Sequence, residues 1–437
     1  MNLDRIAQAL FIAATAFLIF IAGALTTMGE IFPYSYLNEA YRAGIAVYRQ
    51  QTEYATPLQT DLWHPARTDA RGVTQHDAAR SAPGYTLYTS GDGPYARMID
   101  AQGKVIHEWR RPFSDVSDER SPMSTPRDDE FIYMRKAHVL PNGDLLAIYI
   151  ASGDTPWGYG MAKLNRESEL LWFYPGRTHH DFDVASDGRI YALTHDFVPA
   201  GPHRQFEDPY LDDYLVVLGP EGDEQRRISL THALATSRFR MLLGTIPHFA
   251  TGDPLHTNAV QRLDNAQAEA IPGAESGDVL LSFRELSLIA VLSVEDEQIV
   301  WATRGPWVEQ HDPRVLDNGN ILIFDNGGAF QPGNASRVLE FNPRTHAVTW
   351  RYAGTPEQPF DSHIRGAAER LRNGNTLITE SNGGRLLEVT AAGEIVWEYV
   401  HPVRGGDAEQ YIPAVSWGQR IAPTQLADAF RSSLARR

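Results

Sequence analysis

Short runs of alternating apolar and polar residues, each followed by a polar turn, recur along the chain from Gly84 onward. Each copy has an apolar alternation, a polar turn, a second alternation and then a tryptophan, although the copy at 214–230 lacks the tryptophan. The last three of these tryptophans are 49 and 47 residues apart. Alternating strands with a period of about 40 to 50 residues are typical of β-propeller blades. Six copies therefore predict an all-β, six-bladed propeller, and the tryptophans are Trp109, Trp172, Trp301, Trp350 and Trp397.

A second repeated element, a polar turn that ends in glycine before a β-prone run, alternates with the first. Asn-Gly or Asp-Gly between two β-prone runs indicates a hairpin, because a type I′ turn requires positive φ at both central residues. Each blade is expected to contain an inner hairpin built on this turn and an outer hairpin that ends at the tryptophan, which packs between blades. The late β-prone stretch 414–421 is a candidate strand for closing the ring. The turns are Asn142-Gly143, Asp187-Gly188, Asn318-Gly319 and Asn373-Gly374.

The N-terminal segment carries a different pattern, an uninterrupted apolar run from Ile6 to Leu25. Only Gln8 and Thr15 are polar among these twenty residues, and none is charged. A helix of this length spans about 30 Å, the thickness of a bilayer core. The run is too long for a typical buried core helix, and it is longer than a usual signal-peptide core, so an uncleaved transmembrane helix is favoured. Ala22-Gly23-Ala24 leaves cleavage as a signal peptide open.

These patterns divide the chain into four expected parts: a membrane anchor at 1–28, a short stalk at 29–82, the propeller at 83–402 and a C-terminal extension at 403–437. Residues 36–52 of the stalk have helical character. Arg5 precedes the apolar run, and Arg42 is the one basic residue in the twenty positions after it. Basic residues mark the cytoplasmic side only weakly here. The expected location is the cytoplasmic (inner) membrane, with a single pass and the propeller on the periplasmic, extracytoplasmic side.

Charge and cysteine content narrow the range of partners. The formal net charge of −16 argues against nucleic acid or anionic lipid as a partner of the propeller, because both require basic surface. An anionic substrate is compatible with this charge only where cationic groups are concentrated. Cysteine is absent, which excludes a disulfide, a thiolate nucleophile and a cysteine metal site.

Histidine and arginine recur at one register position of the predicted inner hairpins. His180, His311 and Arg135 each stand eight residues before a turn glycine, where the last blade has Gly366. His256 begins the matching strand of a blade whose hairpin loop is longer. Equivalent positions in a propeller lie on a ring, so these side chains are expected to converge near one mouth of the central channel. Three histidines at corresponding strand starts favour a functional site over ordinary core packing.

A second register position lies seven residues after the turn glycine and holds Arg284 and His195 in two blades. It is the other end of the inner hairpin, and therefore belongs to an adjacent layer of the same mouth. Asp181 follows His180 and Asp312 follows His311. Each carboxylate either orients the neighbouring imidazole or alternates to the other face of its strand.

Three histidines and an arginine suit two kinds of ligand. Imidazole binds zinc, copper or iron, but a fixed arginine cation nearby repels a metal. The alternative ligand is a tetrahedral oxyanion. In that case arginine and protonated histidine donate to sulfate or phosphate oxygens, and a neutral histidine serves as the nucleophile.

The sequence resembles the bacterial arylsulfate sulfotransferases over roughly residues 84–400. Members of that family are six-bladed propellers that act outside the cytoplasm. They move a sulfuryl group from an aryl sulfate ester to a phenol without a nucleotide sulfate donor. The motifs occur in the family's order, and they are His179-His180-Asp181, His256-Thr257-Asn258, Gly277-Asp278-Val279-Leu280-Leu281-Ser282-Phe283-Arg284, Gln310-His311-Asp312-Pro313 with the Asn318-Gly319-Asn320 turn, and Phe324-Asp325-Asn326-Gly327.

By this resemblance, His311 matches the histidine that becomes transiently sulfated. The residues that match those binding the sulfuryl oxygens and stabilising the transition state are His180, His256 and Arg284. Further substrate contacts are expected from Arg135, His179, His195 and Asn258. The implied activity is a ping-pong sulfotransferase with a sulfohistidine intermediate, an aryl sulfate donor and a phenolic acceptor. Neither a cofactor nor a metal is expected.

The sequence departs from the well-studied members at several points. They have an N-terminal β-sandwich and a disulfide, which a membrane helix, a short stalk and the absence of cysteine replace here. The oligomeric state is therefore unknown. The Ala-rich loop from Asn265 to Ser276 is a candidate for reshaping the mouth and its acceptor specificity. Two other functions stay open: a non-catalytic propeller that binds a small anion or a membrane partner, and a hydrolase of sulfate or phosphate esters.

Overall fold

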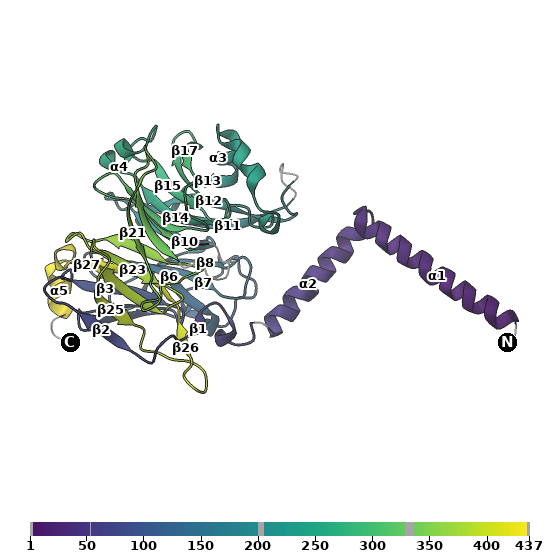
Figure 1. Cartoon of the computed structure of the whole chain (residues 1–437), viewed down its shortest axis with the longest axis horizontal. Coiled ribbons are helices and arrows are strands. Elements are labelled where there is room, and N and C mark those ends of the chain that lie inside the picture. Colours follow the sequence, from purple (N-terminus) through teal and green to yellow (C-terminus); the bar gives the residue numbers. More distant parts are fainter. Residues whose placement is uncertain (1–2, 53, 200–204, 328–335, 435–437) are drawn as a thin grey trace. The chain divides into compact units, whose positions relative to one another are not determined.

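The computed structural model describes residues 3–52, 54–199, 205–327 and 336–434 (Figure 1). The chain forms two compact units, residues 1–59 and 60–437. The N-terminal unit contains helix α1 (Leu3–Met28) and helix α2 (Tyr34–Thr52). Helix α2 confirms the helical character expected for the stalk. The most apolar stretch of helix α1 has a mean hydropathy of 2.3, and none of its residues is buried. It is long and apolar enough to cross a membrane.

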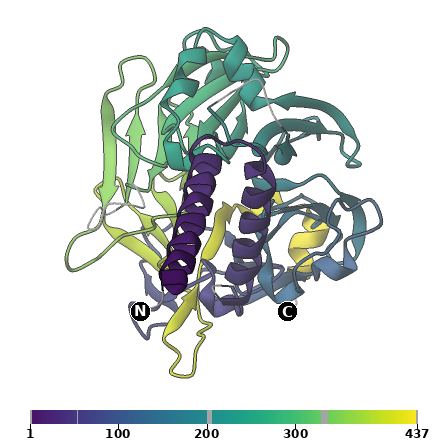
Figure 2. The same ribbon diagram turned by 90° about the vertical axis from the view of Figure 1, so that its right-hand side faces the viewer.

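Among the described residues, the second unit contains six antiparallel sheets of four or five strands besides a small two-stranded sheet, so the expected six-bladed propeller is confirmed. The sheets follow one another around a ring in the order of the sequence (Figure 2). From the innermost strand outward, blade 1 is β27 (Val415–Ile421), β3 (Tyr85–Ser90), β4 (Tyr95–Ile99) and β5 (Val105–Arg110), and blade 2 is β6 (Ile132–Val139), β7 (Leu145–Ala151), β8 (Gly158–Leu164) and β9 (Leu170–Tyr174). Blade 3 is β10 (Thr178–Val184), β11 (Ile190–Val198), β12 (Tyr210–Leu218) and β13 (Glu224–Ser229).

Blade 4 is β14 (Thr257–Arg262), β15 (Val279–Phe283), β16 (Leu288–Ser293) and β17 (Gln298–Thr303). Blade 5 is β18 (His311–Val315), β19 (Ile321–Asp325), β20 (Arg337–Phe341) and β21 (Val348–Ala353). Blade 6 is β22 (Ala367–Arg370), β23 (Thr376–Glu380), β24 (Arg385–Val389), β25 (Ile395–Val400) and β2 (Gly72–His76). The connections contain helices α3 (Leu230–Thr236), α4 (Asn265–Ala270) and α5 (Asp428–Leu434) and short 3₁₀ turns at Pro57–Gln59, Phe113–Asp115, Asp129–Phe131, Arg240–Thr245, His248–Ala250 and Pro423–Gln425.

The C-terminal segment closes the ring, as its β-prone pattern suggested. Strand β27 pairs with β3 from Val415 opposite Ser90 to Ile421 opposite Tyr85, and it is the innermost strand of blade 1. The segment expected as an extension thus supplies propeller strands. In the segment expected as stalk, β1 (Trp63–Pro65) pairs with β26 (Tyr411–Pro413), and β2 is the fifth strand of blade 6.

The repeated tryptophans connect neighbouring blades. The indole N–H of Trp109 donates to the carbonyl of Gly143 at 3.0 Å, from the outermost strand of blade 1 to the inner turn of blade 2. Three others make the same kind of bond to the next blade, namely Trp172 to Pro220, Trp350 to Ala391 and Trp397 to Ala101. An indole that packs its ring and satisfies its N–H in this way suits a buried blade boundary. The packing role expected for these tryptophans is confirmed.

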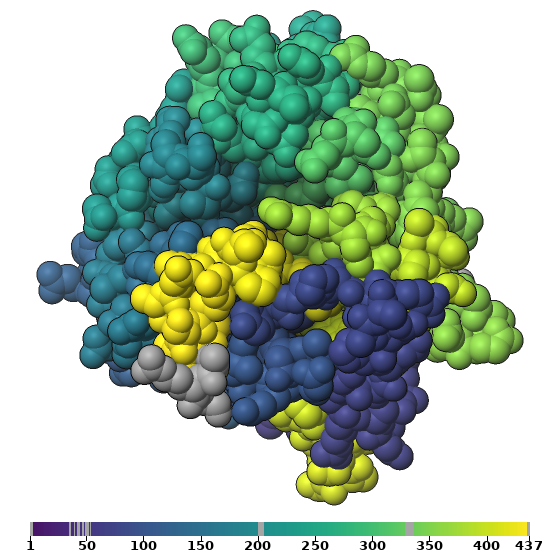
Figure 3. Space-filling view, turned by 90° about the vertical axis from the view of Figure 1, so that its left-hand side faces the viewer, coloured from purple at the N-terminus to yellow at the C-terminus, as the bar shows by residue number. Residues whose placement is uncertain are grey.

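Helix α5 covers the boundary between blades 1 and 2 (Figure 3, yellow). The ring of Phe430 lies 5.3 Å from His107 and 6.1 Å from Trp109, centre to centre. Gly143 has φ +92°, and a Cβ there would lie 2.6 Å from the Phe430 ring, so the turn residue must be glycine. Burial of a phenylalanine side chain contributes about 1.5–3 kcal/mol. Helix α5 therefore stabilises the blade boundary next to the closing strand.

Candidate functional site

The innermost strands carry bulges toward their N-terminal ends. Register irregularities occur in β6, β10, β14, β18 and β27, the inner strands of blades 1 to 5. Positive φ angles accompany them at His180 (+54°), His256 (+46°) and Asp312 (+52°). Bulges redirect side chains, and positive φ in a residue other than glycine is a strained conformation that is concentrated at functional sites. The chain distorts these strands where the histidines are placed.

Asn326 fixes the tautomer of His311. Its Nδ1 lies 2.7 Å from Oδ1 of Asn326, and the Nδ2 of that amide donates to the carbonyls of Ser362 and Arg365 at 2.6 and 2.7 Å. The amide orientation is therefore set, and its oxygen must face the imidazole. Nδ1 of a neutral His311 carries the proton, and Nε2 carries the lone pair.

Electrostatics keep that ring neutral. Burial holds the pKa of His311 well below its usual value, and the charges of Arg284 and Arg135 act in the same direction. The side chain is buried, with 3% exposed. An uncharged imidazole with a free Nε2 lone pair is the form of histidine that acts as a nucleophile.

Two cations beside His311 are held by carboxylates. Nη2 of Arg284 lies 2.9 Å from Oε2 of Glu309, and Nη1 pairs with Glu285. Nδ1 of His256 pairs with Asp253. Burial works to lower the pKa of His256, but the charge of Asp253 and its hydrogen bond outweigh burial and raise that pKa. His256 therefore favours the protonated form, with Nε2–H as a donor, and Arg284 is a permanent cation.

The expected convergence of distant histidines is present in the structure. The rings of His180 and His256 lie 4.9 Å apart, centre to centre, although they come from blades 3 and 4. Burial holds the pKa of His180 well below its usual value, and electrostatic interactions with the neighbouring groups His256, His179, Arg135 and His311 act in the same direction. These groups come from blades 2 to 5, are close enough to act on one another and constitute one polar site.

The four other predicted site residues are also buried. Arg135 is 4% exposed and donates to the Ser416 carbonyl of β27 at 2.6 Å, and Asn258 is 3% exposed and donates to the Gln310 carbonyl at 2.8 Å. His179 and His195 are completely buried, with their rings stacked 4.4 Å apart. Direct substrate contact stays a prediction for Arg135 and Asn258. The two buried histidines present no surface to solvent.

Trp157 is a member of the site that sequence reasoning missed. It lies between β7 and β8, away from the position of the blade-ending tryptophans. Its ring is near four imidazoles, at 4.6 Å from His195, 5.3 Å from His256, 6.1 Å from His180 and 6.3 Å from His179. An indole face stabilises a neighbouring cation, so it supports the protonated His256. The sequence signal that could have identified Trp157 is its position outside the repeat of blade-ending tryptophans.

The carboxylates next to the histidines serve the inner strands instead of the imidazoles. Asp181 pairs with Lys136 and, at 2.8 Å, with Arg314, which also lies 2.6 Å from Asp312. These four groups, of which Arg314 is partly exposed and the others are buried, come from β6, β10 and β18. Buried charges require such pairing. Of the two roles considered for Asp181 and Asp312, alternation away from the imidazole is the one observed.

The Ala-rich loop does not reshape the mouth. Helix α4 occupies its start, with Asp264 as the N-cap in a capping box with Gln267. The loop follows the C-terminal end of β14, whereas His256 precedes the N-terminal end. Six residues of strand place the two about 20 Å apart. The expectation of a reshaped mouth is wrong, because the inner turns lie at the opposite end of the strands from the histidines.

Comparison with known proteins agrees with this geometry. A family model for arylsulfotransferases (ASST) matches residues 136–402, more than half of the chain. A search of curated protein sequences finds no match. Similar solved structures include a protein of unknown function from Bacteroides caccae (12% identity, TM-score 0.47, covering 76% of this chain and 99% of that one) and selenomethionine-substituted virginiamycin B lyase from Staphylococcus aureus (11%, 0.40, 79% and 89%). At these scores the structural likeness carries no argument about function. The match over most of the propeller, which contains the histidines described above, shows that the chain belongs to the arylsulfotransferase family.

Proposed function

We propose that this protein moves a sulfuryl group from an aryl sulfate ester to a phenolic acceptor through a sulfohistidine at His311. The observation that supports this most strongly is the pairing of a neutral nucleophile with held cations. Asn326 leaves the Nε2 lone pair of His311 free, while Arg284 and His256 are kept cationic by carboxylates. A sulfuryl group needs this combination, because it presents an electrophilic sulfur surrounded by anionic oxygens.

The proposed first half-reaction sulfates the enzyme. The Nε2 lone pair of His311 attacks sulfur, the bond between sulfur and the aryl oxygen breaks, and its electron pair leaves with the phenolate. A neighbouring histidine protonates that oxygen. His256 and Arg284 donate charge-assisted hydrogen bonds to the sulfuryl oxygens, and these bonds strengthen as negative charge develops.

The second half-reaction reverses the first with a different phenol. The acceptor oxygen attacks sulfur, the N–S bond breaks and its electron pair returns to Nε2 of His311. The acceptor proton goes to the histidine that gave one up before. Aryl sulfate and phenol are consumed and a new aryl sulfate and phenol are formed, so no nucleotide donor is needed.

The N-terminal helix adds a proposed location. An α1 that crosses the bilayer makes the protein a single-pass membrane protein. We place it in the cytoplasmic membrane with the propeller on the periplasmic side, where small aryl sulfates and phenols are its only proposed partners.

The decisive experiment uses the full-length protein in detergent with 4-nitrophenyl sulfate. Transfer predicts release of nitrophenolate that depends on added phenol, hydrolysis predicts release without it, and a binding protein releases none. Without acceptor, the intact mass should rise by one sulfuryl group, about 80 Da, on His311, and phenol should remove it.

If His311 only binds sulfate, its replacement by asparagine should cost about 1.5–3 kcal/mol, roughly 10- to 150-fold in rate. A nucleophile predicts a loss several orders of magnitude larger, so a His311→Asn variant that keeps most of its activity would refute the proposal.

A further inference from the structure

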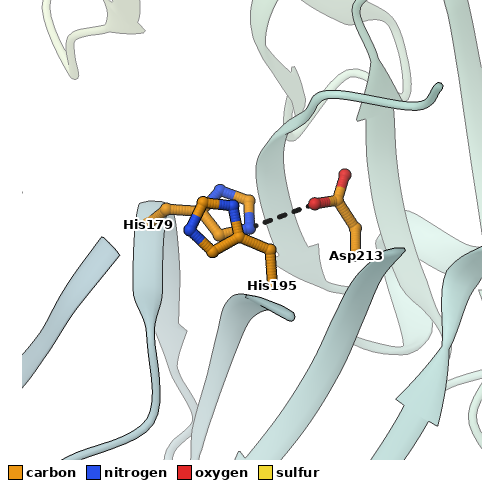
Figure 4. A group of neighbouring side chains, drawn as sticks. All are labelled: His179, His195 and Asp213. Carbon is orange, nitrogen blue, oxygen red and sulfur yellow. Dashed lines mark ion pairs between the residues drawn. The ribbon is translucent and has the colours of Figure 1, made fainter. Parts of the chain in front are cut away.

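A group of three buried side chains lies next to His180: His179, His195 and Asp213 (Figure 4). Their exposed fractions are 0%, 0% and 2%. Nε2 of His179 is 3.3 Å from Oδ1 of Asp213. Among the described residues, neither of these atoms nor Nδ1 of His195 has a regular hydrogen-bond partner. Unpartnered polar atoms this deep in a protein are uncommon and require an explanation.

Two histidines and a carboxylate resemble a metal site, but the proton positions argue against one. Nε2 of His195 accepts the backbone N–H of Gly158 at 3.1 Å. A neutral imidazole that accepts at Nε2 carries its proton at Nδ1, so Nδ1 cannot bind a metal and keep that proton. The rings of His179 and His195 are also stacked with their planes 28° apart, so their in-plane lone pairs lie in two nearly parallel planes. Two remaining ligands are fewer than a zinc site uses.

The same contacts assign protons along a chain. Oδ2 of Asp213 accepts the backbone N–H of Thr257 at 2.6 Å. Burial alone would raise the pKa of Asp213, but the contact with His179 and the bond from Thr257 hold that pKa below its usual value. Facing an ionised carboxylate, Nε2 of His179 carries a proton. Nδ1 of His179 is then the acceptor in its 2.7 Å contact with Nδ1 of His180. His180 consequently presents an unprotonated Nε2.

We propose that Asp213, His179 and His180 form a proton chain, and that His180 is the histidine that exchanges a proton with the aryl oxygen. This inference rests on the proposed function. Arg284 is a cation and the pairing with Asp253 favours the protonated form of His256, so both suit the sulfuryl oxygens, whereas His180 has its Nε2 free of partners among the described residues. Asp213 and His179 are positioning residues, since only His180 meets the substrate.

The chain carries one proton through the reaction. In the second half-reaction the acceptor hydroxyl gives its proton to Nε2 of His180, and the Nδ1 proton of His180 shifts to Nδ1 of His179. The positive charge then rests on His179 beside the Asp213 carboxylate. The first half-reaction of the following turnover runs the other way: Nδ1 of His180 takes the proton back from His179, and Nε2 of His180 gives its own proton to the departing aryl oxygen. Before its first turnover the enzyme holds no extra proton on these residues, and the first phenolate leaves unprotonated. No proton is created or lost over a full cycle.

The test is Asp213→Asn. An asparagine oxygen still accepts from Thr257, which turns the amide NH₂ toward Nε2 of His179. Nε2 must then accept, so His179 donates from Nδ1, and His180 becomes protonated at Nε2 and cannot take a proton from phenol. Loss of general base catalysis lowers the rate about 10²- to 10⁴-fold. Asp212→Asn is the matched control, because Asp212 is a buried neighbour on β12 bonded to Ser229 instead.

The half-reactions are measured separately by intact mass. Nitrophenolate leaves without a proton, so sulfation of His311 by 4-nitrophenyl sulfate should persist in Asp213→Asn. The removal of that sulfuryl group by phenol should slow about 10²- to 10⁴-fold, and Asp212→Asn should leave it unchanged. If wild type forms the adduct, and phenol removes it equally fast from wild type and from Asp213→Asn, the proton chain is overturned and the proposed function stays intact. No adduct in wild type refutes the proposed function itself.

Two measurements on the wild-type protein keep the inference testable if the variant does not fold. Imidazole nitrogen-15 shifts should show His180 protonated at Nδ1 and unprotonated at Nε2, and the opposite tautomer overturns the chain. Elemental analysis should find no stoichiometric zinc. Zinc bound at one equivalent through His179, His195 and Asp213 would establish the metal site instead.

Discussion

Three histidines in this site have three different partners, and the partner decides what each ring can do. Asn326 accepts a hydrogen bond from Nδ1 of His311 and so leaves the lone pair on Nε2, while burial and the charges of Arg284 and Arg135 keep the ring neutral. Asp253 raises the pKa of His256. His180 meets another imidazole and reaches a carboxylate only through it. In the proposed mechanism, one residue type thus supplies a nucleophile, a cation and a proton carrier.

The role of Asp253 gives a prediction about pH. Because the carboxylate raises the pKa of His256, the protonated ring persists to higher pH than an ordinary histidine. Its contribution to anion binding, and to folding, is complete below the unfolded pKa of about 6.5 and is lost as pH rises through the folded value. In Asp253→Asn the raising effect of the carboxylate is gone, so burial lowers the pKa of His256. The alkaline limb of kcat/KM for 4-nitrophenyl sulfate should therefore move to lower pH. At neutral pH kcat/KM should fall about 10-fold or more. An alkaline limb that stays in place would show that His256 is not the cation the donor needs.

Register counting located the histidines but not the residues that control them. His180, His256 and His311 could be found because a propeller repeats its strands, and positions at one distance from the turn lie on one ring. Asp253 and Trp157 come from connections between strands, and Asp213 lies on a middle strand. Those positions have no repeated register. Only the folded chain brings them against the imidazoles.

The strands themselves show where local sequence signals end. The Asn-Gly and Asp-Gly turns and the tryptophans indicated the hairpins, because each is a local requirement of the backbone or of packing. The bulges at the mouth were not predictable, since His180 and His256 have positive φ although neither residue is a glycine. Strands β1 and β2 were read as stalk because they are short, and their partners lie about 320 to 350 residues away.

Gly366 provides a test of strand geometry at the mouth. It has φ +108°, and a Cβ would lie 2.6 Å from the Phe324 ring. Gly374, in the turn of the same hairpin, has φ +87° but open space around it. Gly374→Ala should therefore cost only backbone strain, about 1–2 kcal/mol, whereas Gly366→Ala adds a clash and should cost about 2–5 kcal/mol in total. Denaturant unfolding of both variants measures the difference, and equal losses would mean that Phe324 moves aside freely.

For the whole chain, the membrane helix predicts how the protein fractionates. Full-length protein should sediment with membranes and resist extraction by high salt, because an apolar helix is not held there by charge. A chain that begins at Thr60, where the second compact unit starts, should stay in the soluble fraction and keep its activity on 4-nitrophenyl sulfate. Mature protein whose first residue lies near Leu25 would establish a cleaved signal peptide and rule out a permanent anchor.

Ring closure by β27 predicts a sharp length requirement. A chain that ends at Pro413 lacks β27, loses the burial of Val415 and Ile421, worth about 3–6 kcal/mol, and leaves Arg135 without Ser416. It should have a markedly lower Tm and no measurable transfer. A chain that ends at Ala427 keeps β27 and loses only α5, so it should lose stability but retain activity. Equal activity of the two chains would show that β27 is dispensable.

That closing strand also determines when the protein acquires its chemistry during synthesis. A ribosome makes blades 2 to 6 complete before it reaches residue 415, yet the guanidinium beside the reactive histidines has its partner on β27. A polypeptide cut short by a premature stop codon or by a protease near its end therefore contains every proposed catalytic residue and still lacks a finished site. Only a polypeptide that extends through β27 is therefore expected to be active, so an activity measurement distinguishes the complete protein from one that lacks its C-terminal end.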